Sequence, residues 1–232
     1  MMGRLGLLGV PSSAAAHGPG QEKAPAALRR GGLPERLAAA GVRVADYGDL
    51  PVVRWRPDPH QRRPHNLQPV LGVLRETSRR VGEILAAELA GLGPARPLLR
   101  DDRLLLFGYT DYPGAEHDVL VRRDLAGLPA DRIRGRPEQA AEEALALVRA
   151  STDRFLLHLD VDVVDFLDLP VADIPLHNAG LTFDEAMRCL TVFAGHQSLA
   201  GLIVTEFNPD HGAEDGSTTD ALVRGLVGAL AG

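Results

Sequence analysis

The 232-residue sequence contains little lysine, one cysteine and no long apolar run. These scarcities argue against a nucleic-acid groove, an internal disulfide and a membrane span. Lys23 is the only lysine, and the arginines form no dense basic run. A nucleic-acid groove requires clustered Lys and Arg, so the net charge of -6 and the pI near 5.7 argue against one. We therefore expect the partners of this chain to be small molecules or further copies of itself.

The single cysteine and the short apolar runs also limit where the chain can act. Cys189 has no second cysteine with which to form an internal disulfide, and it lies in a helical pattern where a buried apolar thiol is the ordinary role. No stretch approaches the ~20 apolar residues that a membrane span requires. The start, MMGRLGLLGVPSS, fits a first strand better than a secretion signal. We expect a cytoplasmic protein.

Strand-like and helix-like segments alternate along the sequence. Residues 5–10 predict a strand, residues 24–40 a helix and residues 42–47 a second strand. A strand–helix–strand unit of this kind implies parallel strands covered by helices. With 45% hydrophobic residues the chain can bury one sizeable core, so we expect a single α/β domain over residues 1–232.

The same alternation continues to the end of the chain. Apolar residues spaced by three, four or seven predict a long helix over residues 68–92. Thr182 and Glu185 match a capping box, which predicts a helix from there to about residue 194. Residues 50–65 are expected to form a surface loop. The remaining expected strands cover 103–109, 117–121, 155–165 and 199–205, and the remaining helices cover 137–150 and 219–230.

The segment FLLHLDVDVVD, residues 155–165, is read as a buried strand that ends in acidic side chains. Strand alternation places Asp160 and Asp162 on one face, about 6.6 Å apart along the strand. Two like charges there are unfavourable unless a cation lies between them, and a divalent cation that prefers oxygen is the simplest candidate. The alternative is that these acids cap loops or pair with an arginine. A metal site is the leading hypothesis.

The DxD pattern also occurs in two other classes of protein. Glycosyltransferases hold manganese with such a pattern, but no nucleotide signal accompanies it here. Aspartate-based phosphatases require a hydroxyl residue where Val164 stands. His158 precedes Asp160 by two residues and is expected on the same face, whereas His17 lies in a predicted loop where a solvated side chain is the ordinary case.

Glu206 ends the expected strand 199–205. In open α/β sheets ligands bind beyond the carboxyl ends of the strands, so Glu206 is expected to face the same crevice as the two aspartates. A carboxylate there suits a guanidinium or amine group, because it complements a planar fork of N–H donors. The alternative is an exposed acid at a strand end.

Three segments, in this order along the chain, resemble the ureohydrolase superfamily, which includes arginase, agmatinase and formimidoylglutamase. The opening from LGVPSS to YGDLP resembles the N-terminal region of arginases, HLDVDVVDF resembles the metal motif SFDxDxxDP, and LAGLIVTEFNPDH resembles the strand ending LDIMEVNP. The resemblance implies a three-layer α/β/α fold with a mainly parallel sheet, and a homo-oligomer. It further implies hydrolysis of a guanidino or amidino C–N bond by a hydroxide that bridges two manganese ions.

The resemblance also implies roles for particular residues. Asp160 and Asp162 would be manganese ligands, and Glu206 would orient the guanidinium group of an arginine-like or agmatine-like substrate. It names no catalytic residue, and it leaves open whether His17 or His117 moves into the crevice.

Two motifs of the superfamily are missing from this sequence. The GGDHS-like and DAHxD-like segments that complete the binuclear cluster are not present, and only GLGPARPLLR stands where the family places both. An octahedral ion requires about six donors, so one manganese ion or none is expected here.

We therefore predict an arginase-like fold shortened in the middle. Two functions stay open: a ureohydrolase, and a catalytically inactive, internally truncated descendant with at most a weak single metal site.

Overall fold

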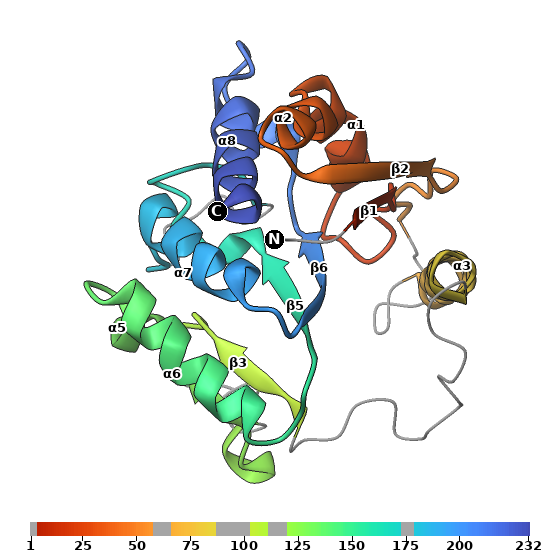
Figure 1. Cartoon of the computed structure of the whole chain (residues 1–232). Helices are drawn as coiled ribbons and strands as arrows, with labels where there is room; N and C mark the ends of the chain where they lie inside the picture. The colour runs from red at the N-terminus through yellow and green to blue at the C-terminus, as the bar shows by residue number, and fades with distance from the viewer. Residues whose placement is uncertain (1–3, 58–65, 87–102, 111–119, 173–178) are drawn as a thin grey trace.

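The computed structural model describes residues 4–57, 66–86, 103–110, 120–172 and 179–232 (Figure 1). Within these residues the strands form three pairs, all parallel, as the alternating pattern predicts. The pairs are β1 (Arg4–Gly9) with β2 (Arg43–Asp49), β3 (Leu105–Phe107) with β4 (Ala126–Leu128), and β5 (Phe155–Asp160) with β6 (Leu199–Thr205).

Helices and short turns connect these strands. Figure 1 shows α7 and α8 beside β5, α6 beside β3, and α3 apart from them. None of the helices in the described ranges is long and apolar enough to cross a membrane. In chain order the elements are η1 (Gln21–Lys23), α1 (Ala24–Arg30), α2 (Leu33–Ala39), α3 (Leu67–Ala86), α5 (Ala130–Ile133), α6 (Pro137–Arg149), η3 (Val161–Val163), α7 (Phe183–Gly195), η4 (Pro209–His211) and α8 (Ser217–Ala231).

The single helix predicted over residues 24–40 is wrong, because it is broken at two glycines. Gly32 has a φ of 78°, a left-handed conformation that ends α1 and precedes α2. Gly31 faces Val223 on α8, and a Cβ on this glycine would lie 3.0 Å from the Val223 Cγ2 atom. The break thus lets the α1–α2 corner pack closely on α8.

The middle of the chain differs from its sequence prediction. Leu120 and Val121 lie in a helical turn, so the strand predicted over residues 117–121 is wrong in its described part, and residues 117–119 lie outside the described residues. The strand in this region is β4, whose sequence AGL has no alternation to indicate it. The end of the helix predicted over 68–92, from residue 87, and the segment 91–100, where the shortening was predicted, lie outside the described residues.

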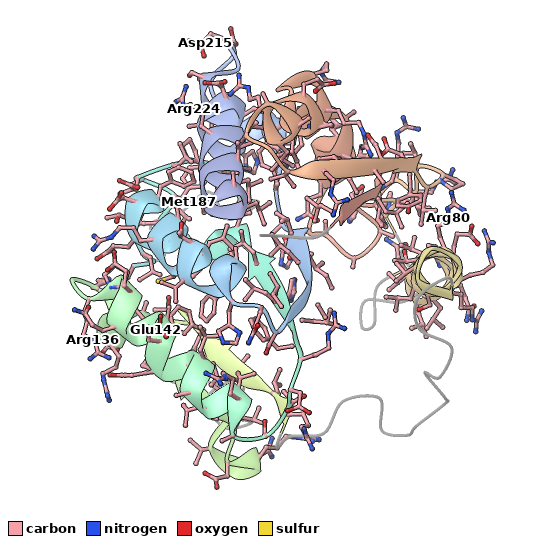
Figure 2. All side chains as sticks on the ribbon, in the orientation of Figure 1. Arg80, Arg136, Glu142, Met187, Asp215 and Arg224 are labelled. Atoms are coloured by element: carbon pink, nitrogen blue, oxygen red, sulfur yellow. The ribbon has the colours of Figure 1, made fainter. Side chains whose placement is uncertain are left out.

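Two groups of buried apolar side chains form the core. One joins α2, α8 and β6, and the other joins α5, α6 and α7; Leu157 and Phe183 pack against both. Close contact between α7 and α8 depends on Gly225, where a Cβ would lie 2.7 Å from the Met187 sulfur (Figure 2). Each fully buried leucine or valine contributes roughly 1.5–3 kcal/mol to folding.

One face of the β5–β6 pair lies outside this core. Leu157 and Leu159 point into it, whereas Leu156 is 69% exposed and Ile203 on the neighbouring strand is 50% exposed. Within the described residues, the strand that was predicted to be buried is thus covered on the face of Leu157 and Leu159. The burial of its residues alternates, with Leu157 and Leu159 on the side that packs against the core of the described residues.

Candidate metal and substrate site

The acidic residues meet at the carboxyl edge of the β5–β6 pair. Asp160 is the last residue of β5 and pairs in register with Thr205, the last residue of β6, so Glu206 follows at the same edge. The strand does not continue to Asp162 as predicted. Residues 161–163 form a 3-10 turn that buries Val161, which is 1% exposed, in the core.

The turn nevertheless keeps the two aspartates together. The backbone N–H of Asp162 donates to Asp160 Oδ1 at 3.4 Å, so the Asp160 side chain caps the turn. The segment before α7 holds this turn from the other side: Leu181 N donates to the Val163 carbonyl oxygen and Asp165 N donates to the Leu181 carbonyl oxygen, both at 2.8 Å. Backbone bonds of this kind fix the position of the acids.

Only glycine fits at one point of that contact. A Cβ on Gly180 would lie 2.6 Å from the Val163 carbonyl oxygen and 2.7 Å from the Asp165 nitrogen, closer than real Cβ atoms approach. The chain before α7 therefore packs backbone against backbone on the acidic turn. The turn that carries the two aspartates is therefore held by close backbone contact.

The electrostatics of the aspartates are unfavourable without a cation. Burial, then the neighbouring Asp162, then Glu206 raise the pKa of Asp160 to about 7. Burial also raises the pKa of Asp162, against the lowering effects of the Asp160 side chain and of His158. Within the described ranges no arginine or lysine forms an ion pair with Asp160. A buried carboxylate such as that of Asp160 retains a proton or attracts an external cation.

The histidines lie at different places relative to the acidic edge. His158 Nε2 lies 2.7 Å from Thr205 Oγ1 on the exposed face of the strand pair, and its charge acts on Asp162. His17 is exposed in the loop after β1. His211, in η4, has its Nδ1 atom 2.6 Å from the Ala172 carbonyl oxygen. His117 lies outside the described residues.

Glu206 has an unusual backbone and a partner that sequence analysis did not identify. Its φ of 63° is left-handed, a conformation that costs a non-glycine residue energy and is concentrated at functional sites. Gln21, at the start of η1, donates a hydrogen bond from Nε2 to Glu206 Oε2. No local pattern marks Gln21, because the contact joins opposite ends of the sequence.

The described side chains offer only part of the ligand set that a manganese centre requires. Carboxylate oxygens are suitable ligands for a hard divalent ion, and Asp160 and Asp162 together can hold one. No group of three or more His, Cys, Asp or Glu side chains arranged to hold a metal occurs among residues 4–57, 66–86, 103–110, 120–172 and 179–232. The described side chains thus fit one ion completed by water and do not make up a two-ion cluster.

Comparison with known proteins identifies the family. The profile described as Arginase family matches residues 92–231, more than half of the sequence, so the chain belongs to the arginase family. No curated protein sequence matches the chain significantly.

Solved structures of this family have the same fold. An arginase from Bacillus caldovelox superposes with a TM-score of 0.83 at 19% identity, covering 100% of this chain and 99% of that one. Formimidoylglutamase from Bacillus subtilis gives a TM-score of 0.71 at 18% identity, covering 99% and 86%. A Trypanosoma cruzi formiminoglutamase solved with manganese gives 0.70 at 17% identity, covering 97% and 91%. The predicted three-layer α/β fold of the arginase type is confirmed.

Proposed function

We propose that this protein is a manganese-dependent hydrolase of a guanidino or amidino C–N bond, with an arginine-like or agmatine-like substrate. Asp160 and Asp162 bind the metal, and Glu206 binds the cationic group of the substrate. The observation that supports this proposal is the meeting of three acids at one strand edge, where the pKa of Asp160 is raised to about 7. Membership of the arginase family points to the same chemistry.

The residues of the chain have distinct tasks in this proposal. Glu206 accepts N–H donors from a planar cation, a geometry in which two parallel charge-assisted bonds can form. Asp160 must lose its proton to become a ligand, so metal affinity increases as the pH rises through about 7. When bound, a divalent ion supplies a lowered pKa for water and hence a nucleophile at neutral pH.

A non-catalytic role is the second candidate. It is favoured by the donor set, because the described residues contain no group of three metal-binding side chains. In that case the fold and the acidic edge persist, and any ion is bound weakly through Asp160, Asp162 and water.

Metal analysis together with a turnover assay separates the two candidates. The protein is incubated with Mn²⁺, freed of unbound metal and analysed for manganese, and urea or ammonia release is measured from arginine, agmatine and formimidoylglutamate. We expect bound manganese and turnover, and we expect Asp160→Ala to reduce turnover by about 100-fold or more, since even residues that only support ligands cost 10–100-fold.

Asp153→Ala is the matched control, because Asp153 is an exposed aspartate just before the opposite end of β5. It should bind manganese and turn over substrate as the unchanged protein does. Absence of both manganese and turnover in the unchanged protein would exclude the hydrolase and leave the non-catalytic candidate.

A further inference from the structure

The segment of residues 20–23 is fastened along the chain that follows β6. Gln21 donates to Glu206, and two residues further on Lys23 forms an ion pair with Asp210. Gly20, the residue before Gln21, has a φ of 134° and lies against the side chain of Asn208, where a Cβ would be 2.3 Å from Nδ2. Three contacts in succession therefore join the N-terminal segment to the substrate-binding edge.

A buried carboxylate fixes this segment. Glu22 is 8% exposed, and its carboxylate accepts the backbone N–H of Gly20 at 2.8 Å. Burial raises the pKa of Glu22, but hydrogen bonds from Gly20 and Ser13 lower it, and the result lies below the ordinary value. Glu22 is thus ionised at neutral pH, and its bond to Gly20 holds the backbone from which the Gln21 side chain reaches Glu206.

The chemistry of the contact decides how the Gln21 amide is oriented. A carboxylate can only accept hydrogen bonds, so the amide must turn its NH₂ group toward Glu206. The amide oxygen then lies on the other branch of the same planar group, and among the described residues it accepts no hydrogen bond. The neutral amide oxygen of Gln21 therefore lies beside the carboxylate of Glu206 at the proposed substrate site, and both can accept hydrogen bonds.

We propose that Gln21 is a specificity-determining residue, which holds Glu206 in place with its amide nitrogen and presents its amide oxygen to the same ligand. This inference rests on the proposed function and adds the residue through which the site selects its cation. A guanidinium group is a planar fork with five N–H donors, whereas an ammonium group is a compact, strongly hydrated charge. A carboxylate joined to a fixed neutral oxygen suits the planar fork, so the site selects guanidinium or amidinium groups over amines.

The experiment compares two cations of equal charge on the full chain. Binding of butylguanidine and of pentylamine is measured by calorimetry, with and without Mn²⁺, for the unchanged protein, Gln21→Met and Gln21→Ala. Methionine has similar length without either amide group, and alanine provides a second variant if methionine perturbs folding. We expect both variants to weaken the binding of both cations, because Glu206 loses the contact that holds it. The loss should be about 10-fold larger for butylguanidine than for pentylamine, the value of one hydrogen bond to a charged group.

Lys23→Met is the matched control, because it removes the neighbouring contact to Asp210 and leaves Glu206 and Gln21 intact. It should change neither affinity by more than about 2-fold, as expected for an exposed ion pair. Equal losses for both cations in the Gln21 variants, or no loss, would overturn the inference. So would an unchanged protein that binds neither cation.

Turnover distinguishes this inference from the proposed function. If the Gln21 variants hydrolyse a guanidino substrate with unchanged KM, the hydrolase stands and the inference fails. If the protein neither keeps manganese nor turns over, but guanidine selectivity still depends on Gln21, the hydrolase fails and the inference stands.

Discussion

Two of the parallel strand pairs end in clustered acids, and these two clusters differ in their surroundings. Near the end of β2, Arg29 bonds Asp46 at 2.8 Å and also pairs with Asp49. Arg29 is the main cause of the lowered pKa of Asp46. At the end of β5 no arginine or lysine of the described segments forms an ion pair with Asp160, whose pKa is raised to about 7.

The difference shows what an acidic cluster at a strand end means in this fold. Where the chain supplies its own guanidinium, the carboxylates are satisfied and the cluster is part of the structure. Where the described residues supply none, the folded protein bears the cost of repulsion and burial, and a cation bound there would relieve that cost. The contrast lies in the neighbours of the acids and not in the acids themselves.

The largest expected effect concerns the pH dependence of stability at the β5 end. Asp160 has a raised pKa when folded, so it binds more protons in the folded state than in the unfolded state between about pH 4 and pH 7. Its contribution to stability is present below pH 4 and is lost as the pH rises through 7. At about 1.4 kcal/mol for each pKa unit, the loss amounts to a few kcal/mol.

Urea unfolding of the metal-free protein and of Asp160→Asn, from pH 4.5 to 7.5 in EDTA, measures this effect. The free energy of unfolding of the variant should exceed that of the unchanged protein by an amount that grows with pH. Mn²⁺ at pH 7.5 should stabilise the unchanged protein and not the variant. If the free energies of unfolding of the two proteins change with pH in parallel, folding does not raise the pKa of Asp160.

The β2 cluster should show the opposite dependence when its cation is removed. Arg29→Leu leaves Asp46 and Asp49 without their partner, and we expect a loss of about 2 kcal/mol at pH 7, moderated by water because these side chains are 24–35% exposed. Because the pKa of Asp46 is lowered, the lost contribution is present above about pH 4 and vanishes below it.

Arg30→Leu is the matched control for this change, since Arg30 is the next residue, is exposed and forms no ion pair within the described ranges. Thermal unfolding of both variants at pH 4 and pH 7 gives the comparison. A destabilisation by Arg29→Leu that is as large at pH 4 as at pH 7 would mean that lost packing, and not lost charge, is its cause.

Much of the fold could be predicted because its signals are local. The apolar run of residues 199–205 became β6, and the capping box became the start of α7, where Glu185 N donates to Thr182 Oγ1 at 3.2 Å. The break at Gly31 and Gly32 was missed because the helical pattern continues on both sides. The three-residue strand β4 is too short to show alternation.

The site was only partly predictable for a related reason. Sequence order and parallel pairing were enough to place Asp160 and Glu206 at one edge. The turn at Val161 was not predictable, because it depends on burying that side chain in a core built by other elements. The contact of Gln21 with Glu206 depends on tertiary packing between distant segments.

The smallest expected effect tests whether the start of α7 supports the acidic turn beside it. Thr182→Ala removes the hydroxyl that caps Glu185 N, at a cost of about 1 kcal/mol. The bonds that fix the turn come from the backbone of Leu181, and Asp168 still accepts the N–H of Phe183 at 2.6 Å. The stabilisation by Mn²⁺ should therefore persist in this variant.

Thr191→Ala is the control in the same helix, because its exposed hydroxyl bonds only the Met187 carbonyl oxygen at 2.9 Å and alanine is a good helix former. In thermal unfolding without metal, Thr182→Ala should be less stable than the unchanged protein, and Thr191→Ala should not. Mn²⁺ should stabilise the two variants equally. If Thr182→Ala also removes the gain from the metal, the cap of α7 positions the aspartates. The β5 cluster would then depend on the start of a helix for its geometry, whereas the side chain of Arg29 and the backbone N–H of Gly48 hold Asp46 in the β2 cluster.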